Sequence, residues 1–255
     1  MNNKFVGLYT IVRRQVRRTF RIWIQTILPA AITSILYFII FGHVIGSRVG
    51  SMQGYNYIQF IAPGLIMMQI ITSSYNASVS ALYGDRFKNC IDEILVSPMP
   101  SSFILLGYIV GGVFRGSLVG LLVSCIALFF THIHVYSFSI ILLSALLTAA
   151  IFSTAGVINA VFAKSFDDIS IIPTFVLTPL TYLGGVFYSV LLLPPFWQKL
   201  SLVNPILYMV DGFRYGFLHL ADSHIFIAFS VMFVLLIGLY MLALHLFKNS
   251  PAFRQ

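Results

Sequence analysis

Charge is what this chain of 255 residues has least of: only 9% of its residues are Asp, Glu, Lys or Arg, and just seven are acidic. A soluble domain carries about 25% charged residues, and so few could not cover a soluble surface. Apolar residues make up 59% of the chain, and the mean hydropathy is +0.94. This composition excludes a soluble enzyme, a nucleic-acid-binding module and a disordered protein, and it predicts a polytopic membrane protein.

Reactive motifs are also missing. Cys90 and Cys125 have neither a nearby thiol nor a metal-ligand spacing, so no zinc site or disulfide framework is predicted. The sequence contains no phosphate-binding loop, no H-E-x-x-H and no G-x-S-x-G. His132 and His134 are two residues apart, and interfacial histidines are a better interpretation of them than a metal site. We therefore expect no catalytic residue, metal or cofactor in this chain.

Six segments have the length and apolarity of a membrane-spanning helix, for which roughly 20 residues are needed. They lie at about 22–46, 57–80, 103–131, 138–163, 170–193 and 224–247. None contains Asp or Glu, and this absence weighs against an ion-coupled carrier. Arg115 is the one charge inside a span, and we favour a snorkelling role for it over a place on a polar path.

Basic residues mark the two sides of the membrane. If the N-terminus lies inside, eleven of the fifteen Lys and Arg residues face the cytoplasm and three lie outside. The positive-inside rule therefore predicts that both termini are cytoplasmic. Residues 5–21 form a separate predicted element, a basic amphipathic helix lying in the interface. No loop is long enough for a soluble domain, so residues 1–255 are predicted to be one all-α membrane domain.

The loop between the second and third spans is unusually polar. Residues 84–97 alternate charges of opposite sign with apolar side chains at helical spacing, and prolines follow. We expect a short amphipathic helix. It could dock into a groove on a soluble partner or serve as a solvated connector, and the residues alone do not decide between these.

Small residues and prolines distinguish two further regions. The third span carries glycines four residues apart, which allow close helix packing against a neighbour that the sequence does not identify: Gly107, Gly111, Gly112, Gly116 and Gly120. Residues 194–218 follow the fifth span, lie outside in this topology and are too apolar for a free loop. We expect short re-entrant helices that cap the outer end. The sequence does not decide whether they serve as an aromatic belt or as a gate.

Three segments resemble the ABC-2-type transporter permeases, and most closely the small YadH-like bacterial inner-membrane permeases. They are I-D-E-I-L-V-S-P-M-P at 91–100, F-D-D-I-S-I-I-P-T-F-V-L-T-P-L-T-Y-L-G-G-V-F-Y-S at 166–189, and L-P-P-F-W-Q-K-L-S-L-V-N-P-I-L-Y-M-V-D-G-F-R-Y-G-F at 193–217. The resemblance covers roughly residues 5–247. It implies the membrane subunit of an exporter in the bacterial inner membrane, acting as a homodimer with two copies of a separate ATPase that binds MgATP.

The resemblance also assigns roles within the chain. Residues 84–97 would be the coupling helix seated in the ATPase, and residues 5–21 the connecting helix. The coupling contacts fall on Arg86, Asp92, Glu93, Leu95 and Pro98. The outer cap or gate falls on Pro194, Pro195, Trp197, Asn204, Pro205, Asp211 and Arg214.

The substrate stays open among polysaccharides, lipid-linked glycans, lipids and drugs. Two other functions are compatible with the residues. One is an ATP-independent carrier or channel, for which the spans lack carboxylates but offer a proline-broken helix. The other is a membrane scaffold that transports nothing, which predicts that the loop at 84–97 can be replaced without loss of phenotype.

Overall fold

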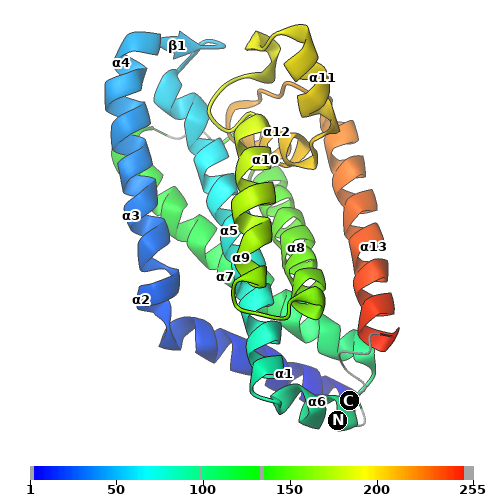
Figure 1. Ribbon diagram of the computed structural model, residues 1–255. Coiled ribbons are helices and arrows are strands. Elements are labelled where there is room, and N and C mark those ends of the chain that lie inside the picture. The colour runs from blue at the N-terminus through cyan, green and yellow to red at the C-terminus, as the bar shows by residue number, and fades with distance from the viewer. Residues whose placement is uncertain (1–2, 98, 133–134, 250–255) are drawn as a thin grey trace.

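The computed structural model describes residues 3–97, 99–132 and 135–249 and is almost wholly helical (Figure 1). The long helices are α1 (Asn3–Arg21), α5 (Tyr57–Phe87), α7 (Ser101–Phe130), α8 (Phe138–Phe162) and α13 (Ile225–Asn249). Figure 1 shows α1 across one end of the bundle, which we call the α1 end. The described parts of the sequence thus confirm the prediction of an all-α protein with an N-terminal amphipathic helix.

The first span is an interrupted helix at the edge of the bundle. It consists of α2 (Trp23–Thr26), α3 (Leu28–Tyr37), the π-helix η1 (Phe38–Ile45) and α4 (Gly46–Val49). A hairpin of β1 (Ser51–Met52) and β2 (Tyr55–Asn56) follows, pairing Ser51 with Asn56 and Met52 with Tyr55. Its turn residues Gln53 and Gly54 both have positive φ, the conformation that such tight hairpins require. We call this opposite end of the bundle the hairpin end.

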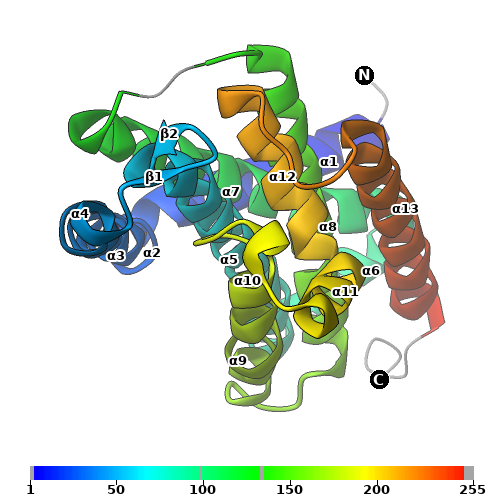
Figure 2. The same cartoon turned by 90° about the horizontal axis from the view of Figure 1, so that it is seen from above.

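The centre of the bundle is α5, which packs mainly between α7 and α8. In the apolar 18-residue stretch of α5, 78% of the residues are buried inside the protein, whereas the corresponding share in α13 is 11%. Viewed from above, α5 has α3 and α4 on one side and α8 and α13 on the other (Figure 2). Large apolar side chains on the outer faces of α3 and α13 are exposed, as expected for helices that contact lipid: Ile32, Leu36, Val234, Ile237 and Met241.

Five helices in the described residues are long and apolar enough to cross a membrane, whereas the sequence predicted six spans. The predicted span at 170–193 is shorter than expected. Its helix comprises α9 (Asp168–Ile172), the π-helix η2 (Pro173–Leu177) and α10 (Thr178–Leu183). Sixteen residues reach about 24 Å, less than a hydrocarbon core of about 30 Å. The helix ends here because Gly185 has a φ of +70° and reverses the chain.

Short helices complete both ends. At the α1 end lies α6 (Cys90–Val96) (Figure 1). At the hairpin end lie the 3-10 helix η3 (Val190–Leu192), α11 (Pro195–Val203) and α12 (Pro205–Leu218). The predicted coupling helix at 84–97 is therefore divided. Residues up to Phe87 continue α5, and Asn89, with a left-handed φ of 54°, separates them from α6.

Candidate functional site: the α6 junction and the outer cap

The amphipathic helix α1 is seated on α7 through two glycines. A Cβ atom at Gly107 would lie 2.6 Å from Cγ2 of Ile11, and one at Gly111 would lie 2.6 Å from Cβ of Gln15. Any side chain there would push the helices apart. Edge-to-face rings support the contact further along, with Phe20 and Phe114 centroids 6.0 Å apart. The first half of α7 therefore runs beside α1.

The other three glycines of this span face α5. A Cβ at Gly116 would lie 2.8 Å from Cβ of Ser74, and one at Gly120 would lie 2.6 Å from Cγ1 of Ile70. Gly112 faces Ser78 and Ser153, whose hydroxyl oxygens are 2.5 Å apart in a buried hydrogen bond. The neighbours that the sequence could not identify thus lie in the same chain.

The end of α5 is tied to α1 and α7 by one carboxylate. Asp85 forms an ion pair with Arg14 of α1 and accepts a 2.6 Å hydrogen bond from the Tyr108 hydroxyl of α7. Arg14 also donates to the Tyr108 oxygen at 3.2 Å. Three elements that are distant in the sequence therefore meet at one side chain, two residues before α5 ends.

Arg86 ties the same end of α5 to α8. Its Nη1 donates to the carbonyl oxygens of Ala160 (2.6 Å), Val161 (3.1 Å) and Ala163 (3.2 Å). The last carbonyls of a helix have no partners within it and carry the negative end of its dipole, so they attract a guanidinium. The structure gives this predicted coupling residue contacts within its own chain, and its side chain holds the end of α5 against the end of α8.

Helix α6 leaves one face free. Ile91 is buried, whereas Glu93 and Val96 are exposed. The side chains of Asp92 and Leu95 are not described, and Pro98 lies outside the described residues. A short helix with one face anchored and the other open has the form of a docking element.

The hairpin end contains the predicted cap residues. Pro194 and Pro195 precede and start α11, and Trp197 is exposed beside Phe196. Asn204 joins two helices: its Oδ1 accepts from the Ile206 amide at 3.0 Å, and its Nδ2 donates to the Leu180 carbonyl at 2.6 Å. Pro205 is the first residue of α12, where its missing N–H costs nothing.

Asp211 and Arg214 of α12 are fully buried, with Nη1 and Oδ1 3.6 Å apart. Arg214 Nη2 donates to the Gly185 carbonyl at 2.6 Å, and its guanidinium lies 4.1 Å from the centroid of the Phe60 ring in α5. This pair of predicted cap residues thus anchors α12 to the chain reversal after α10 and to the bundle centre.

Sequence reasoning missed Asp222. Its carboxylate accepts hydrogen bonds from the Val190 amide (2.8 Å), the Ser189 hydroxyl (2.8 Å) and the Gln53 amide (3.1 Å). It therefore joins the hairpin turn, η3 and the loop before α13. No sequence signal could have found a cluster with members 136 residues apart.

Within residues 3–97, 99–132 and 135–249, no group of three or more His, Cys, Asp or Glu side chains is placed to hold a metal ion. His132 is in this part of the chain, whereas His134 lies outside the described residues.

Comparison with known proteins supplies the family. The ABC-2 type transporter model matches residues 7–218. Over its full 255 residues the chain is 51% identical to the full-length inner membrane transport permease YadH of Escherichia coli K12. It is 24% identical to nodulation protein J of Rhizobium meliloti and 23% identical to that of Rhizobium leguminosarum bv. viciae, over 203 residues and 78% of each chain. The chain therefore belongs to the ABC-2 type transporter family, as a multi-pass membrane transport permease and not an enzyme.

Proposed function

We propose that this chain is the membrane subunit of an exporter in the bacterial inner membrane, driven by a separate cytoplasmic ATPase. The observation that carries the proposal is the junction at the end of α5. Arg86 and Asp85 tie the last turn of α5, which leads into α6, to α8, α7 and α1 at once. A push on α6 would therefore reach four helices instead of bending a loose loop.

The proposed orientation places the α1 end in the cytoplasm. The start of α1 and the end of α13 both lie at this end (Figure 1). Basic residues gather at the same end: those of α1, together with Lys88 and Lys164. The positive-inside rule places such an excess of basic residues on the cytoplasmic side. An ATPase could then meet the exposed face of α6.

In this assembly two copies of the chain, as a homodimer, combine with two ATPase subunits that bind MgATP. Closure of the ATPase pair moves α6, and α5 transmits the movement toward the hairpin end. There α11 and α12 form the outer cap or gate. The proposed cargo is a polysaccharide, lipid-linked glycan, lipid or drug.

The test is purification of the tagged chain from its native membranes in mild detergent, followed by a subunit count and an ATPase assay. We expect a soluble ATPase at a one-to-one ratio and hydrolysis that depends on Mg²⁺. A pure complex without an ATPase and without hydrolysis would overturn the proposal and favour an ATP-independent carrier or channel.

A further inference from the structure

The polar face of α1 borders a basic cavity of about 790 Å³. Six basic side chains line it, and we call it the arginine cavity: Arg13, Arg14, Arg17, Arg18, Arg21 and Lys88. None of the described residues that line it is acidic. The one ion pair that the described residues give to any of the six is that between Arg14 and Asp85. The cavity therefore carries a large excess of positive charge.

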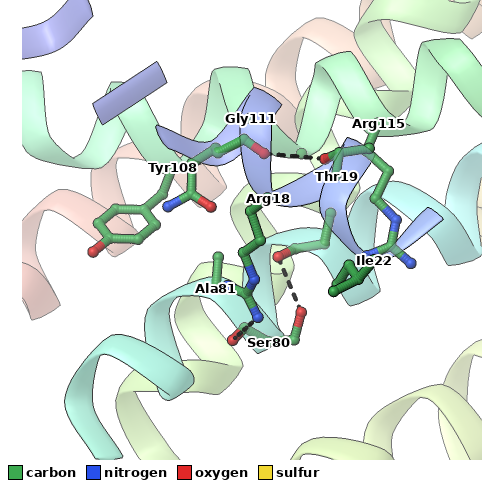
Figure 3. Close-up of a pocket in the computed structure, with 11 residues that line it drawn as sticks. Arg18, Thr19, Ile22, Ser80, Ala81, Tyr108, Gly111 and Arg115 are labelled. Carbon is green, nitrogen blue, oxygen red and sulfur yellow. Dashed lines mark hydrogen bonds between the residues drawn. The ribbon is translucent and has the colours of Figure 1, made fainter. Parts of the chain in front are cut away.

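A second arginine arrangement lies directly behind it. Arg18 and Arg115 border a small inner cavity with room for about one water, and this cavity shares Arg18 and Ile22 with the arginine cavity. Figure 3 shows the two arginines reaching into this space from α1 and α7, with Ser80 of α5 opposite. Arg18 donates to the Ser80 carbonyl at 2.9 Å, whereas Nε of Arg115 is buried and has no hydrogen-bond partner in the described structure.

Two guanidinium groups without a carboxylate between them repel one another in partly dry surroundings. Burial lowers the pKa of the Arg18 guanidinium, and the neighbouring Asp85 opposes that change. Guanidinium groups remain charged in proteins, so their repulsion is relieved by an anion. Phosphate suits them because its oxygens accept paired N–H bonds from arginine.

The surroundings indicate that this phosphate belongs to a lipid. Ile22 and Gln25, at the start of the first span, line the cavity beside the arginines. Phe20, Trp23 and Ile24 next to them are about half exposed, and provide an apolar surface for acyl chains. An interfacial helix lies at the depth of lipid headgroups. A soluble protein could reach the outer arginines, but Arg115 stands behind α1, next to Gly111 and Gly112, which are buried.

We propose that the arginine cavity binds the phosphate group of an anionic phospholipid from the leaflet beside α1, that Arg18, which borders both cavities, holds it there, and that the charge of Arg115 behind Arg18 strengthens the attraction. The proposal needs neither the exporter function nor the orientation of the chain.

The test compares phosphatidylglycerol, phosphatidylcholine and inorganic phosphate as ligands of the purified full-length chain, by native mass spectrometry in detergent. We expect phosphatidylglycerol to bind at least tenfold more tightly than phosphatidylcholine. In Arg18→Gln/Arg115→Gln this preference should fall at least tenfold, and Arg18→Lys/Arg115→Lys should retain part of it. The matched control, Arg48→Gln/Lys199→Gln, removes the same charge from exposed positions at the hairpin end and should bind like the wild type.

Four results would overturn the proposal. Inorganic phosphate that binds as tightly as the lipid would make the ligand a free anion. An equal loss of lipid preference in the test pair and the control pair would show that the preference depends only on the net charge of the chain. An unchanged lipid preference in the Gln pair would show that the two arginines do not hold the lipid, and a loss of a co-purified ATPase with that preference unchanged would assign them to a protein partner.

A second measurement on the unmodified chain covers the case in which the Gln pair does not fold. A photoactivatable phosphatidylglycerol should label peptides from residues 10–25 and 113–118. Labelling spread evenly over all lipid-facing helices, or absent from these two segments, would also overturn the proposal.

Discussion

Tyr108 of α7 donates a 2.6 Å hydrogen bond to Asp85, two residues before the end of α5, and Arg14 of α1 pairs with the same carboxylate. The contact gives α7 and α1 a common attachment at the end of α5, which leads into α6. It also explains why α5 continues past the point at which the sequence predicted a separate coupling helix, since the side chains of Asp85 and Arg86 hold this turn on the bundle.

Asp85→Asn should loosen this junction without unfolding the bundle. The amide oxygen still accepts from Tyr108, but the charge that pairs with Arg14 is lost, and hydrogen bonds to charged groups contribute about 1.5–3 kcal/mol. We expect a loss of about 1–2 kcal/mol in the free energy of unfolding, since Arg14 is partly exposed. Hydrogen exchange should rise in residues 84–97. Tyr108→Phe, which keeps the ion pair, should have the smaller effect, and the reverse order would contradict the assignment.

Glu93→Lys and Leu95→Asp should uncouple ATP hydrolysis from transport while folding and membrane insertion are retained. Glu93 is exposed on α6, so its replacement changes the docking face and no packing contact of the bundle. The measurements are recovery of the ATPase and, in the reconstituted complex, the ratio of transport to ATP hydrolysis. Lys199→Glu, on the exposed surface of α11, makes the opposite charge change at the far end and should leave both unchanged. Normal recovery of the ATPase and a normal ratio of transport to hydrolysis in the α6 variants would refute the docking role.

Two glycine-to-alanine substitutions should change stability in opposite directions. In Gly156→Ala the new Cβ would lie 2.6 Å from the Tyr75 carbonyl oxygen, a backbone atom of α5 that cannot rotate away. Overpacking of this kind costs about 1–3 kcal/mol. At Gly238 on α13 no described atom beyond the local helix backbone lies within 4 Å of the new Cβ, so alanine should gain up to about 1 kcal/mol from helix propensity. Thermal unfolding in detergent tests both, and equal shifts would contradict the helix packing.

Asn204 allows the two halves of one side chain to be tested separately. Asn204→Asp keeps the oxygen that accepts from the Ile206 amide and removes the donor to the Leu180 carbonyl. Asn204→Ala removes both. Loss of a helix N-cap costs about 1 kcal/mol, so we expect the alanine variant to be the less stable of the two by about that amount. Increased proteolysis between α10 and α11 in both variants would show that the Asn204–Leu180 hydrogen bond holds this segment in place. Full resistance in both variants would show that this hydrogen bond does not hold the segment.

What could be predicted from the sequence follows from how local each signal is. The amphipathic pattern of α1 and the prolines after α6 act over a few residues. The sequence therefore predicts both the helix α1 and the end of α6. The glycine spacing of α7 indicated close packing, but the partner Ile11 in α1 is 96 positions from Gly107 and no pattern points to it. The sequence predicts a fifth span that is too long, because apolar residues continue past Leu183. The helix ends earlier because Gly185 has a positive φ, a backbone property that apolar composition does not reveal.

The buried pair in α12 gives the strongest expected destabilisation. Asp211→Asn leaves Arg214 as an unpaired charge at a position with 1% exposure, and Arg214→Gln leaves Asp211 in the same state. Removing one partner of a buried ion pair costs about 3–5 kcal/mol. Replacing both, in Asp211→Asn/Arg214→Gln, removes both charges at once, so the double variant should be more stable than the sum of the single losses predicts. Unfolding of the three variants in one detergent measures this coupling. Strict additivity would show that Arg214 is held by the Gly185 carbonyl and the Phe60 ring alone, because these contacts do not depend on Asp211.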